Sequence, residues 1–365
     1  DLHRRRHSFP TRRSSDLINR NIIMQKFIKK LFKYIDIYGV PIKLKINNQS
    51  ESKTVLGGIL TLMFIGMMIG AAWSTGNDLF YKDKPQTDLE NNLFMERPTY
   101  HLDKYNFPIS FCFQDYTQAV YNIPKYFRFE VINAKTYNLN STTITHNYEF
   151  ENCTFEHFPN LDKQYLKLAG IDKYLCLKDQ NITIGGYWDS AFIQFAIFRL
   201  RMCNNDTDNG ECAPKEEITK WFYSKAAGFN LYFQNSIINT KDYSNPIQNY
   251  IYNLYKNIKL GSSKVINMFI KKSEIHTDSG IIFEDIGLQD TLSYDTSDYD
   301  ESDSLDDTLM DIYMFVANHS PIIHRRYLKI QTVLANLGGL YKALFMAMYA
   351  ITYYFTKTKL NKILL

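Results

Sequence analysis

The chain lacks the short motifs by which many nucleotide-dependent, hydrolytic and metal-dependent enzymes are recognised. It has no Walker loop, GxSxG elbow, HExxH pair, kinase set or Rossmann fingerprint. Its glycine doublets also stand outside the strand–turn–helix context that phosphate binding needs. These doublets are Gly57-Gly58, Gly185-Gly186 and Gly338-Gly339. We therefore expect a protein that is not an enzyme and that carries no cofactor.

Cysteine is scarce and is not arranged for metal binding. The chain has five cysteines and no Cys-x-x-Cys pair, and no histidine has ligand spacing to them, so we expect no metal site. All five lie between positions 112 and 212, which suits an oxidising compartment. Cys203–Cys212 is the bridge we expect first and Cys153–Cys176 the second, although spacing alone leaves connectivity open. Cys112 belongs to an alternating run, residues 109–113, and is expected to be buried in a strand.

An excess of positive charge is also lacking once the start of the chain is set aside. Residues 7–17 match the translation of a short-read sequencing adapter, and we exclude residues 1–17 from fold reasoning. They hold five Arg and two Asp, so the net charge falls from +4 to +1 without them. A nearly neutral chain gives no support for a nucleic-acid partner.

Two long stretches without charge, or nearly so, stand out against this composition. They cover residues 54–76 and 330–356. A helix of 23 residues rises about 34 Å, enough to cross a hydrocarbon core about 30 Å thick. We therefore expect two transmembrane helices and a lipid bilayer as the first partner.

Charge and glycosylation signals predict the orientation of the two spans. Lysines crowd the segment 18–53 and the tail 357–365, which places both termini in the cytosol under the positive-inside rule. Arg325, Arg326 and Lys329 weaken that bias. Residues 77–329 carry five glycosylation sequons, which favour a lumenal or extracellular position. The sequons are at Asn140, Asn152, Asn181, Asn205 and Asn318. The expected location is integral to the plasma membrane or an endomembrane.

The segment before the first span and the large loop have different expected structures. Gln25–Tyr38 reads as a basic amphipathic helix beside the membrane, and residues 40–46 as a short strand. The loop alternates short aromatic and β-branched runs with turn signals, which predicts a β-rich, sandwich-like domain. Expected strands cover residues 126–133, 190–202, 229–233, 248–260, 264–275 and 280–284. One helix is expected after Pro214, and a second over residues 161–168. The acidic segment 290–311 is expected to be a solvated loop rather than a calcium site.

Small and charged residues inside the spans are candidates for packing or a polar path. Gly66 and Gly70 form a GxxxG pattern in the first span, which can pack against span two or another chain. The second span contains Gly338, Gly339 and Lys342. A mid-membrane lysine is costly, so Lys342 either snorkels to a surface, the reading we favour, or lines a polar path in an assembly.

Several short segments resemble a large ciliate family of two-pass transmembrane proteins with a cysteine-containing ectodomain. They are residues 35–42, 53–58, 168–176, 245–247 and 326–339, together with Cys203 and Cys212. The family has no assigned activity, so the resemblance implies topology alone. A more distant likeness in layout is to the ERGIC-type cargo receptors, which also have a Lys-Thr and Gly-Gly entry to span one and a Gly-Gly in span two. Trimeric ligand-gated cation channels share the two-span, disulfide-rich plan.

We therefore expect a two-pass membrane glycoprotein in which two transmembrane helices bracket a β-rich, disulfide-bonded ectodomain. It would act by binding, as a receptor, sorting adaptor or scaffold, with a protein partner or a homo-oligomer. The alternative is a subunit of an oligomeric two-span ion channel.

Overall fold

A computed structural model describes residues 55–364, except 116, 118, 138–140, 189, 209–210, 226 and 304–306. The expected helix Gln25–Tyr38 and the strand after it lie outside the described residues, as does Asn140. The chain divides into two compact units, one made of residues 68–340 and the other of residues 1–67 with 341–365. Each unit is described by itself.

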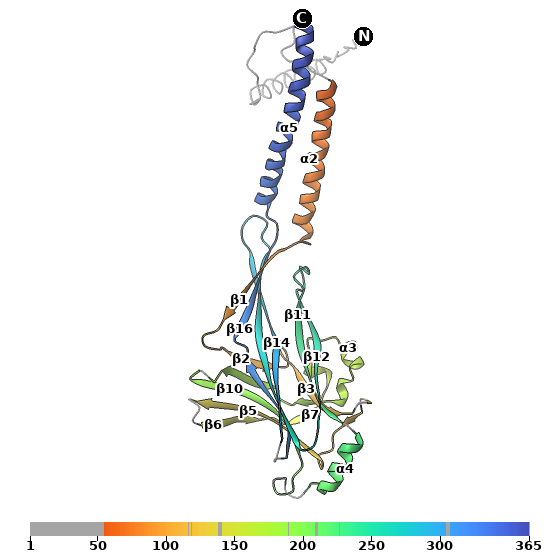
Figure 1. Cartoon of the computed structure of the whole chain (residues 1–365), viewed down its shortest axis with the longest axis vertical. Helices are drawn as coiled ribbons and strands as arrows, with labels where there is room; N and C mark the ends of the chain where they lie inside the picture. The colour runs from red at the N-terminus through yellow and green to blue at the C-terminus, as the bar shows by residue number, and fades with distance from the viewer. Residues whose placement is uncertain are drawn as a thin grey trace, which may run out of the picture. The chain divides into compact units, whose positions relative to one another are not determined.

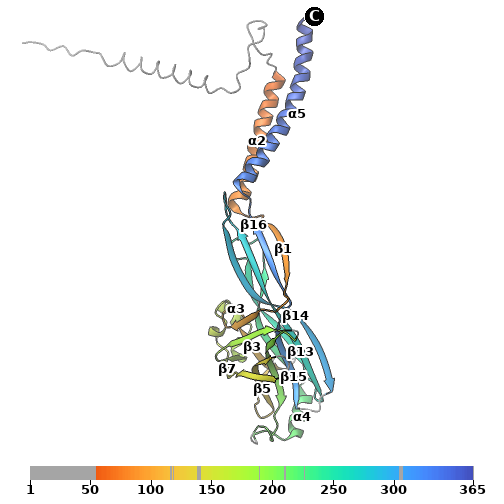
Figure 2. The ribbon, with the colours of Figure 1, turned by 90° about the vertical axis from the view of Figure 1, so that its left-hand side faces the viewer.

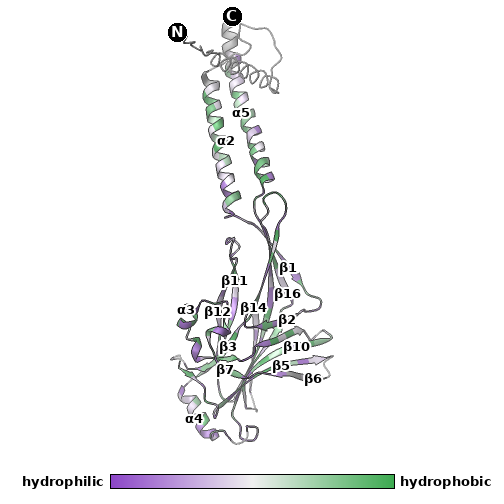
Figure 3. Cartoon of the chain, turned by 180° about the vertical axis from the view of Figure 1, so that it is seen from behind, coloured by the Kyte–Doolittle hydropathy of each residue, from purple (hydrophilic) through white to green (hydrophobic). Residues whose placement is uncertain are grey.

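Two long helices stand at the ends of the described chain (Figure 1). They are α2 (Val55–Tyr81) and α5 (Ile330–Leu364), and hydrophobic residues occur along both (Figure 3). Their stretches Gly57–Tyr81 and Ile330–Phe355 are long and apolar enough to cross a membrane, and none of the most apolar part of either is buried. A core helix of a soluble domain would be mostly covered by protein. The expected fold class, two apolar helices bracketing a β-rich domain with two disulfides, is confirmed.

The first helix is longer than the expected span because the polar residues after Gly76 continue it. It ends where Lys82 takes a left-handed backbone conformation with φ of 55°, a common way to stop a helix.

Sixteen strands and four short helices follow α2 in the described chain. The first eight strands are β1 (Gln86–Leu93), β2 (Thr99–Asp103), β3 (Ile109–Gln114), β4 (Val120–Tyr121), β5 (Phe127–Tyr137), β6 (Ser141–Asn147), β7 (Phe150–Asn152) and β8 (Leu175–Leu177). The others are β9 (Asn181–Gly186), β10 (Phe192–Met202), β11 (Gly228–Ile238), β12 (Ile247–Asn257), β13 (Ser262–Asp278), β14 (Ile286–Asp303), β15 (Thr308–Val316) and β16 (His319–Arg326). The short helices are η1 (Phe155–His157), α3 (Lys163–Leu168), η2 (Ile171–Lys173) and α4 (Lys215–Lys225).

The strands form two sheets that face each other as a sandwich. The larger follows the path β1-β16-β13-β15-β10-β5-β6, and the smaller the path β12-β11-β3-β8-β7. The long strand β13 pairs with β14 on one side and runs parallel to β15 and then β16 on the other. Figure 2 shows β3 and β7 on one side and β13–β15 on the other.

The core lies between the two sheets and is largely aromatic. Phe111 of β3 is 1% exposed, and its ring lies 5.3 Å from Phe129 and 6.2 Å from Phe198 on the opposite sheet. Because side chains alternate along a strand, β13 sends every second residue into this core. Ile266 and Met268 are fully buried there beside their parallel partners on β15.

A second apolar cluster covers the outer face of the smaller sheet. It contains Cys112, 2% exposed in β3, and the disulfide between Cys153 and Cys176. The expected burial of Cys112 in a strand is confirmed. The helix α3 packs into this cluster through Leu166, and Asp162 caps it by accepting the backbone N–H of Gln164 and Tyr165.

The expectation that residues 290–311 form a solvated loop is wrong. Residues 286–303 form the edge strand β14, and residues 308–311 belong to β15. The acidic side chains are tolerated because β13 supplies lysines across the ladder. Lys271 lies 2.8 Å from Asp295, and Lys264 lies 3.5 Å from Glu301. A charged edge strand also resists pairing with other chains.

The strand expected over residues 280–284 is also wrong, because these residues form the turn between β13 and β14. A Cβ at Gly280 would lie 1.8 Å from the carbonyl oxygen of Phe283, so the backbone folds back too tightly for any other residue.

Candidate functional site

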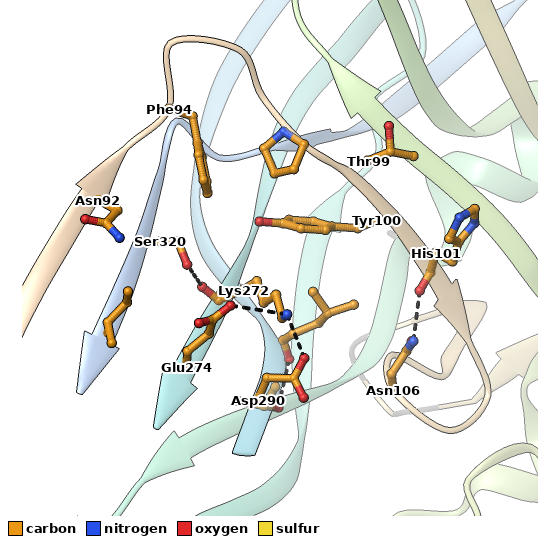
Figure 4. Close-up of a pocket in the computed structure, with 14 residues that line it drawn as sticks. Asn92, Phe94, Thr99, Tyr100, His101, Asn106, Lys272, Glu274, Asp290 and Ser320 are labelled. Carbon is orange, nitrogen blue, oxygen red and sulfur yellow. Dashed lines mark hydrogen bonds and ion pairs between the residues drawn. The ribbon is translucent and has the colours of Figure 1, made fainter. Parts of the chain in front are cut away.

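A cavity of about 690 Å³ opens on the larger sheet (Figure 4). The strands β13, β14 and β16 form its floor, and β1, β2 and the segment joining them form its wall. Its charged groups are Lys272, Glu274 and Asp290, and its aromatic groups include Phe94 and Tyr100. The volume lies within the range usual for small-ligand sites.

Strand register brings two carboxylates together on the floor of the cavity. Glu274 of β13 and Asp290 of β14 are direct antiparallel partners, an arrangement that repels unless a cation intervenes. Lys272 supplies the cation: its Nζ lies 2.9 Å from Asp290 and 3.3 Å from Glu274. The hydrogen bond to Asp290, opposed by burial and supported by that to Glu274, raises the pKa of Lys272. One lysine against two carboxylates leaves one excess negative charge.

An aromatic wall stands above these charges. Tyr100 projects over them in Figure 4 and is 8% exposed. Burial raises the pKa of its hydroxyl to about 12, although Lys272 acts in the other direction, so the phenol is neutral at physiological pH. Phe94 joins the same wall, with its backbone N–H donating to the carbonyl oxygen of Asn318. Aromatic faces beside excess negative charge suit a cationic group.

Polar contacts continue beyond the cavity across two more strands. Glu274 lies 3.5 Å from Nε2 of His276, and the ring of His276 meets that of His324 edge-on at 5.0 Å. His324 in turn lies 3.6 Å from Glu90 on β1. The two histidines meet because they are parallel partners in the ladder of β13 and β16. Nothing in their sequence spacing indicates this contact.

A hydroxyl, an imidazole and a carboxylate also line up near β7. Oγ1 of Thr154 lies 3.0 Å from Nδ1 of His157, and Nε2 of His157 lies 2.9 Å from Glu151. This order resembles a hydrolase triad. However, the backbone N–H of Thr154 donates to the same Nδ1, which makes the group a capping box for η1. It does not line the cavity, so we assign it to helix capping.

One group among the described residues has the spacing of a metal site: Cys203, Asp208 and Cys212. The two cysteines form a disulfide, so their sulfurs are not available as thiolate ligands. Asp208 is instead held by a bidentate contact with Arg201, both oxygen–nitrogen distances being 2.7 Å. This hydrogen bonding, opposed by burial, lowers the pKa of Asp208 to about 2.

The structure also locates the other residues singled out in the sequence. It contains both expected disulfides, Cys203–Cys212 and Cys153–Cys176. Four of the sequon asparagines are described and all four are exposed, which leaves them accessible to modification. They are Asn152, Asn181, Asn205 and Asn318.

The glycines expected to pack do not contact a neighbouring helix within the described chain. A Cβ added at any of the four would meet nothing within 4 Å; they are Gly66, Gly70, Gly338 and Gly339. In the smaller unit α2 and α5 touch through aromatic residues instead, with the rings of Phe64 and Tyr341 meeting edge-on at 5.4 Å. Tyr341 continues into a stack with Phe345 and Tyr349 at spacings of four residues. Lys342 is exposed on α5.

Comparison with known proteins identifies the family from most of the β domain. The family profile that matches is described as "Uncharacterised 80 kDa protein N-terminal domain" and covers residues 107–316, more than half of the chain. No curated protein matches the chain. The ciliate origin stays a prediction.

Two solved structures show a likeness at 10% sequence identity. The cryo-EM structure of a proton-activated chloride channel aligns with a TM-score of 0.29 over 86% of this chain and 100% of that chain. The crystal structure of Erv41p aligns with a TM-score of 0.22 over 64% of this chain and 99% of that chain. At these TM-scores neither likeness supports a fold or a function. From the match over residues 107–316, the chain belongs to the family described as "Uncharacterised 80 kDa protein N-terminal domain".

Proposed function

We propose that this two-span membrane protein acts by binding, and that the cavity of its β domain receives a cationic group of a ligand or partner. The observation that carries the proposal is the charge arrangement on the cavity floor. Lys272 bridges Glu274 and Asp290 and leaves one excess negative charge beneath the ring of Tyr100. A guest ammonium or guanidinium group would complete the pairing of both carboxylates and lie against the aromatic wall.

We further propose that the protein is not an enzyme. The three charged groups of the cavity pair with one another, and no hydroxyl or thiol nucleophile beside a base lines it among the described residues. The free thiol of Cys112 is buried away from the cavity, and burial raises its pKa to about 12, which opposes thiolate chemistry.

We propose the orientation expected from the sequence, with both termini cytosolic and the β domain lumenal or extracellular. Three cations beside span two weaken the charge bias on which this orientation rests, but each of them pairs with another group of the β domain. Arg325 is 1% exposed and donates to the carbonyl oxygens of Thr240 and Asp242. Arg326 pairs with Asp88, and Lys329 lies 2.8 Å from Asp278. The four exposed sequons and two disulfides support the same orientation.

Neutralising both cavity carboxylates tests the binding proposal. In the variant Glu274→Gln/Asp290→Asn, we expect partner recovery to fall about tenfold, because a charge-assisted hydrogen bond contributes about 1.5–3 kcal/mol. The measurement is affinity capture of the tagged full chain from membranes, with quantitative mass spectrometry. The matched control is Asp298→Asn, an exposed aspartate on the same strand outside the cavity. Equal recovery by wild type and both variants would contradict the proposal.

A second candidate function, a subunit of an oligomeric ion channel, is favoured by the position of Lys342. This exposed lysine lies about 18 Å along α5 from Ile330, near the middle of a hydrocarbon core about 30 Å thick. The uncovered glycines would allow close approach of a helix from another copy. Copies arranged around an axis could then place a ring of lysines at a pore.

For the channel, Lys342→Leu is expected to change the single-channel conductance several-fold, because a charged ring sets ion concentration in a narrow pore. The purified full chain would be recorded in planar bilayers. Lys357→Leu, on the same helix beyond the candidate span, is the control and should leave conductance unchanged. Absence of current from the wild-type chain would remove this candidate.

A further inference from the structure

The turn between β13 and β14 carries a run of exposed apolar side chains. Phe283 is 82% exposed, and Ile281, Ile282 and Ile286 are 47–55% exposed. We call these four residues the hairpin tip. Isolated apolar residues on a surface need no explanation, but four within six positions make a contiguous patch.

Hydrogen bonds hold the backbone of the hairpin tip in a defined turn. The carboxylate of Asp278 accepts the backbone N–H groups of Gly280 and Asp285 at 3.1 and 3.0 Å. The N–H of Ser279 donates to the carbonyl oxygen of Asp285 at 2.9 Å, which closes the turn. Asp278 is itself 6% exposed and paired with Lys329. The backbone therefore presents the apolar side chains outward in a fixed arrangement.

Hydrogen bonds join the turn that carries the hairpin tip to the end of the first candidate span and to the start of the second. The backbone N–H of Ile330, the first residue of the second span, donates to the carbonyl oxygen of Ile281 at 3.0 Å. The side-chain amide of Gln331 donates to the backbone carbonyl oxygen of Ile282 at 2.6 Å. Lys82, directly after the first span, donates to the carbonyl oxygen of Ser279 at 2.9 Å. The tip therefore lies at the level where both helices would meet the membrane surface.

We propose that the hairpin tip inserts into the interfacial region of the lipid leaflet that faces the β domain. Apolar groups on interfacial elements penetrate about 5–10 Å, so the side chains of the tip would reach lipid without burying the strands. Aromatic residues at the end of α2 mark the same level, since Phe80 is 77% and Tyr81 71% exposed. Aromatic residues are enriched at this depth.

The bilayer fits the position of the tip better than a second copy of the chain. A contact between copies would place the patch at any height on the domain, whereas this patch shares hydrogen bonds with the first turn of an apolar helix. The inserted tip would act as a third anchor, in addition to the two spans.

The test uses the full chain in nanodiscs, with a cysteine at position 283 carrying an environment-sensitive fluorophore. We expect the probe on Phe283→Cys to emit to the blue of its emission in water and to lose most of its intensity when lipids carry a doxyl quencher near the head group. A probe on Leu288→Cys, two residues beyond the tip and 69% exposed, should be quenched less. The buried Cys112 should take up little label.

Tyr223→Cys provides the control, since Tyr223 is 77% exposed on α4 at the far end of the β domain (Figure 1). Its probe should emit as in water and should not be quenched. If Phe283→Cys does not fold, Ile282→Cys carries the same test. A tip probe that behaves like the α4 control would overturn the proposal. So would a blue-shifted probe that doxyl lipid does not quench and that crosslinks between copies, which would assign the tip to a second chain.

Discussion

Replacing Arg325 by Met is expected to lower the free energy of unfolding of the β domain by about 3 kcal/mol. The guanidinium group is 1% exposed and joins three segments. It donates to Oγ1 of Thr277, its parallel partner on β13, and to the carbonyl oxygens of Thr240 and Asp242. Methionine fills most of the space but leaves these acceptors without a donor, and each buried unsatisfied group costs about 1–3 kcal/mol.

The measurement is the apparent melting temperature of the purified full chain in detergent, compared at one scan rate. A loss of this size corresponds to a decrease of about 6–12 °C for a domain of this length. Arg326→Met is the matched control, because Arg326 is the next residue on β16 but lies 60% exposed beside Asp88. Exposed pairs contribute about 0–1 kcal/mol, so the control should melt close to wild type. Equal shifts in the two variants would show that Arg325 does not join the segments.

The elements that could be read from the sequence are those whose signal is local. The two apolar stretches predict where α2 and α5 begin to within one residue, because length and hydropathy alone decide whether a helix can span. The ends are predicted less well, since α2 continues five residues beyond position 76 and α5 eight residues beyond position 356. The alternation of apolar and polar residues around Cys112 correctly predicted a strand there, because this signal is also local. Cys203 and Cys212 lie nine positions apart, and a short polar loop brings them together without long-range information.

The acidic segment 290–311 forms strands that its own residues do not predict. Read alone, residues 290–311 have too much like charge to form a strand. Three of its acidic side chains pair with Lys264, Lys271 and Lys272 on β13, and these lysines become neighbours only through the register of the hairpin. Strand propensity depends on such cross-strand partners, and the sequence of the acidic segment alone does not reveal that β13 is its partner.

The cavity could not have been found from the sequence either. Tyr100 lies 172 positions before Lys272, and Ser320 lies 48 positions after it, where it donates to the carbonyl oxygen of Lys272. No motif links them, since β13 meets β2, β14 and β16 only in the folded sheet. Only the pairing of Lys272 with Glu274 could be predicted, because residues two positions apart face the same side of a strand.

Arg199 and Asp311 are expected to show strong ionic coupling. They are direct antiparallel partners on β10 and β15, and they form a bidentate pair with two nitrogen–oxygen distances of 2.8 Å. The carboxylate side chain is 10% exposed and that of the arginine 29%. Arg199→Met alone would leave a nearly buried carboxylate without its partner, a change that costs about 3–5 kcal/mol in comparable pairs. We expect the lower end of this range because Tyr313 also lies near Asp311.

The double variant Arg199→Met/Asp311→Leu should recover most of that loss, because apolar side chains of similar volume replace both charges at once and leave no desolvated ion. A double-mutant cycle of melting temperatures measures the coupling. The control cycle uses Lys178→Met and Glu149→Leu, an exposed pair 3.3 Å apart that should couple much more weakly because solvent screens it. Additive losses at Arg199 and Asp311 would mean that each side chain acts through its own packing, and the bidentate pair would then contribute no more than a surface contact.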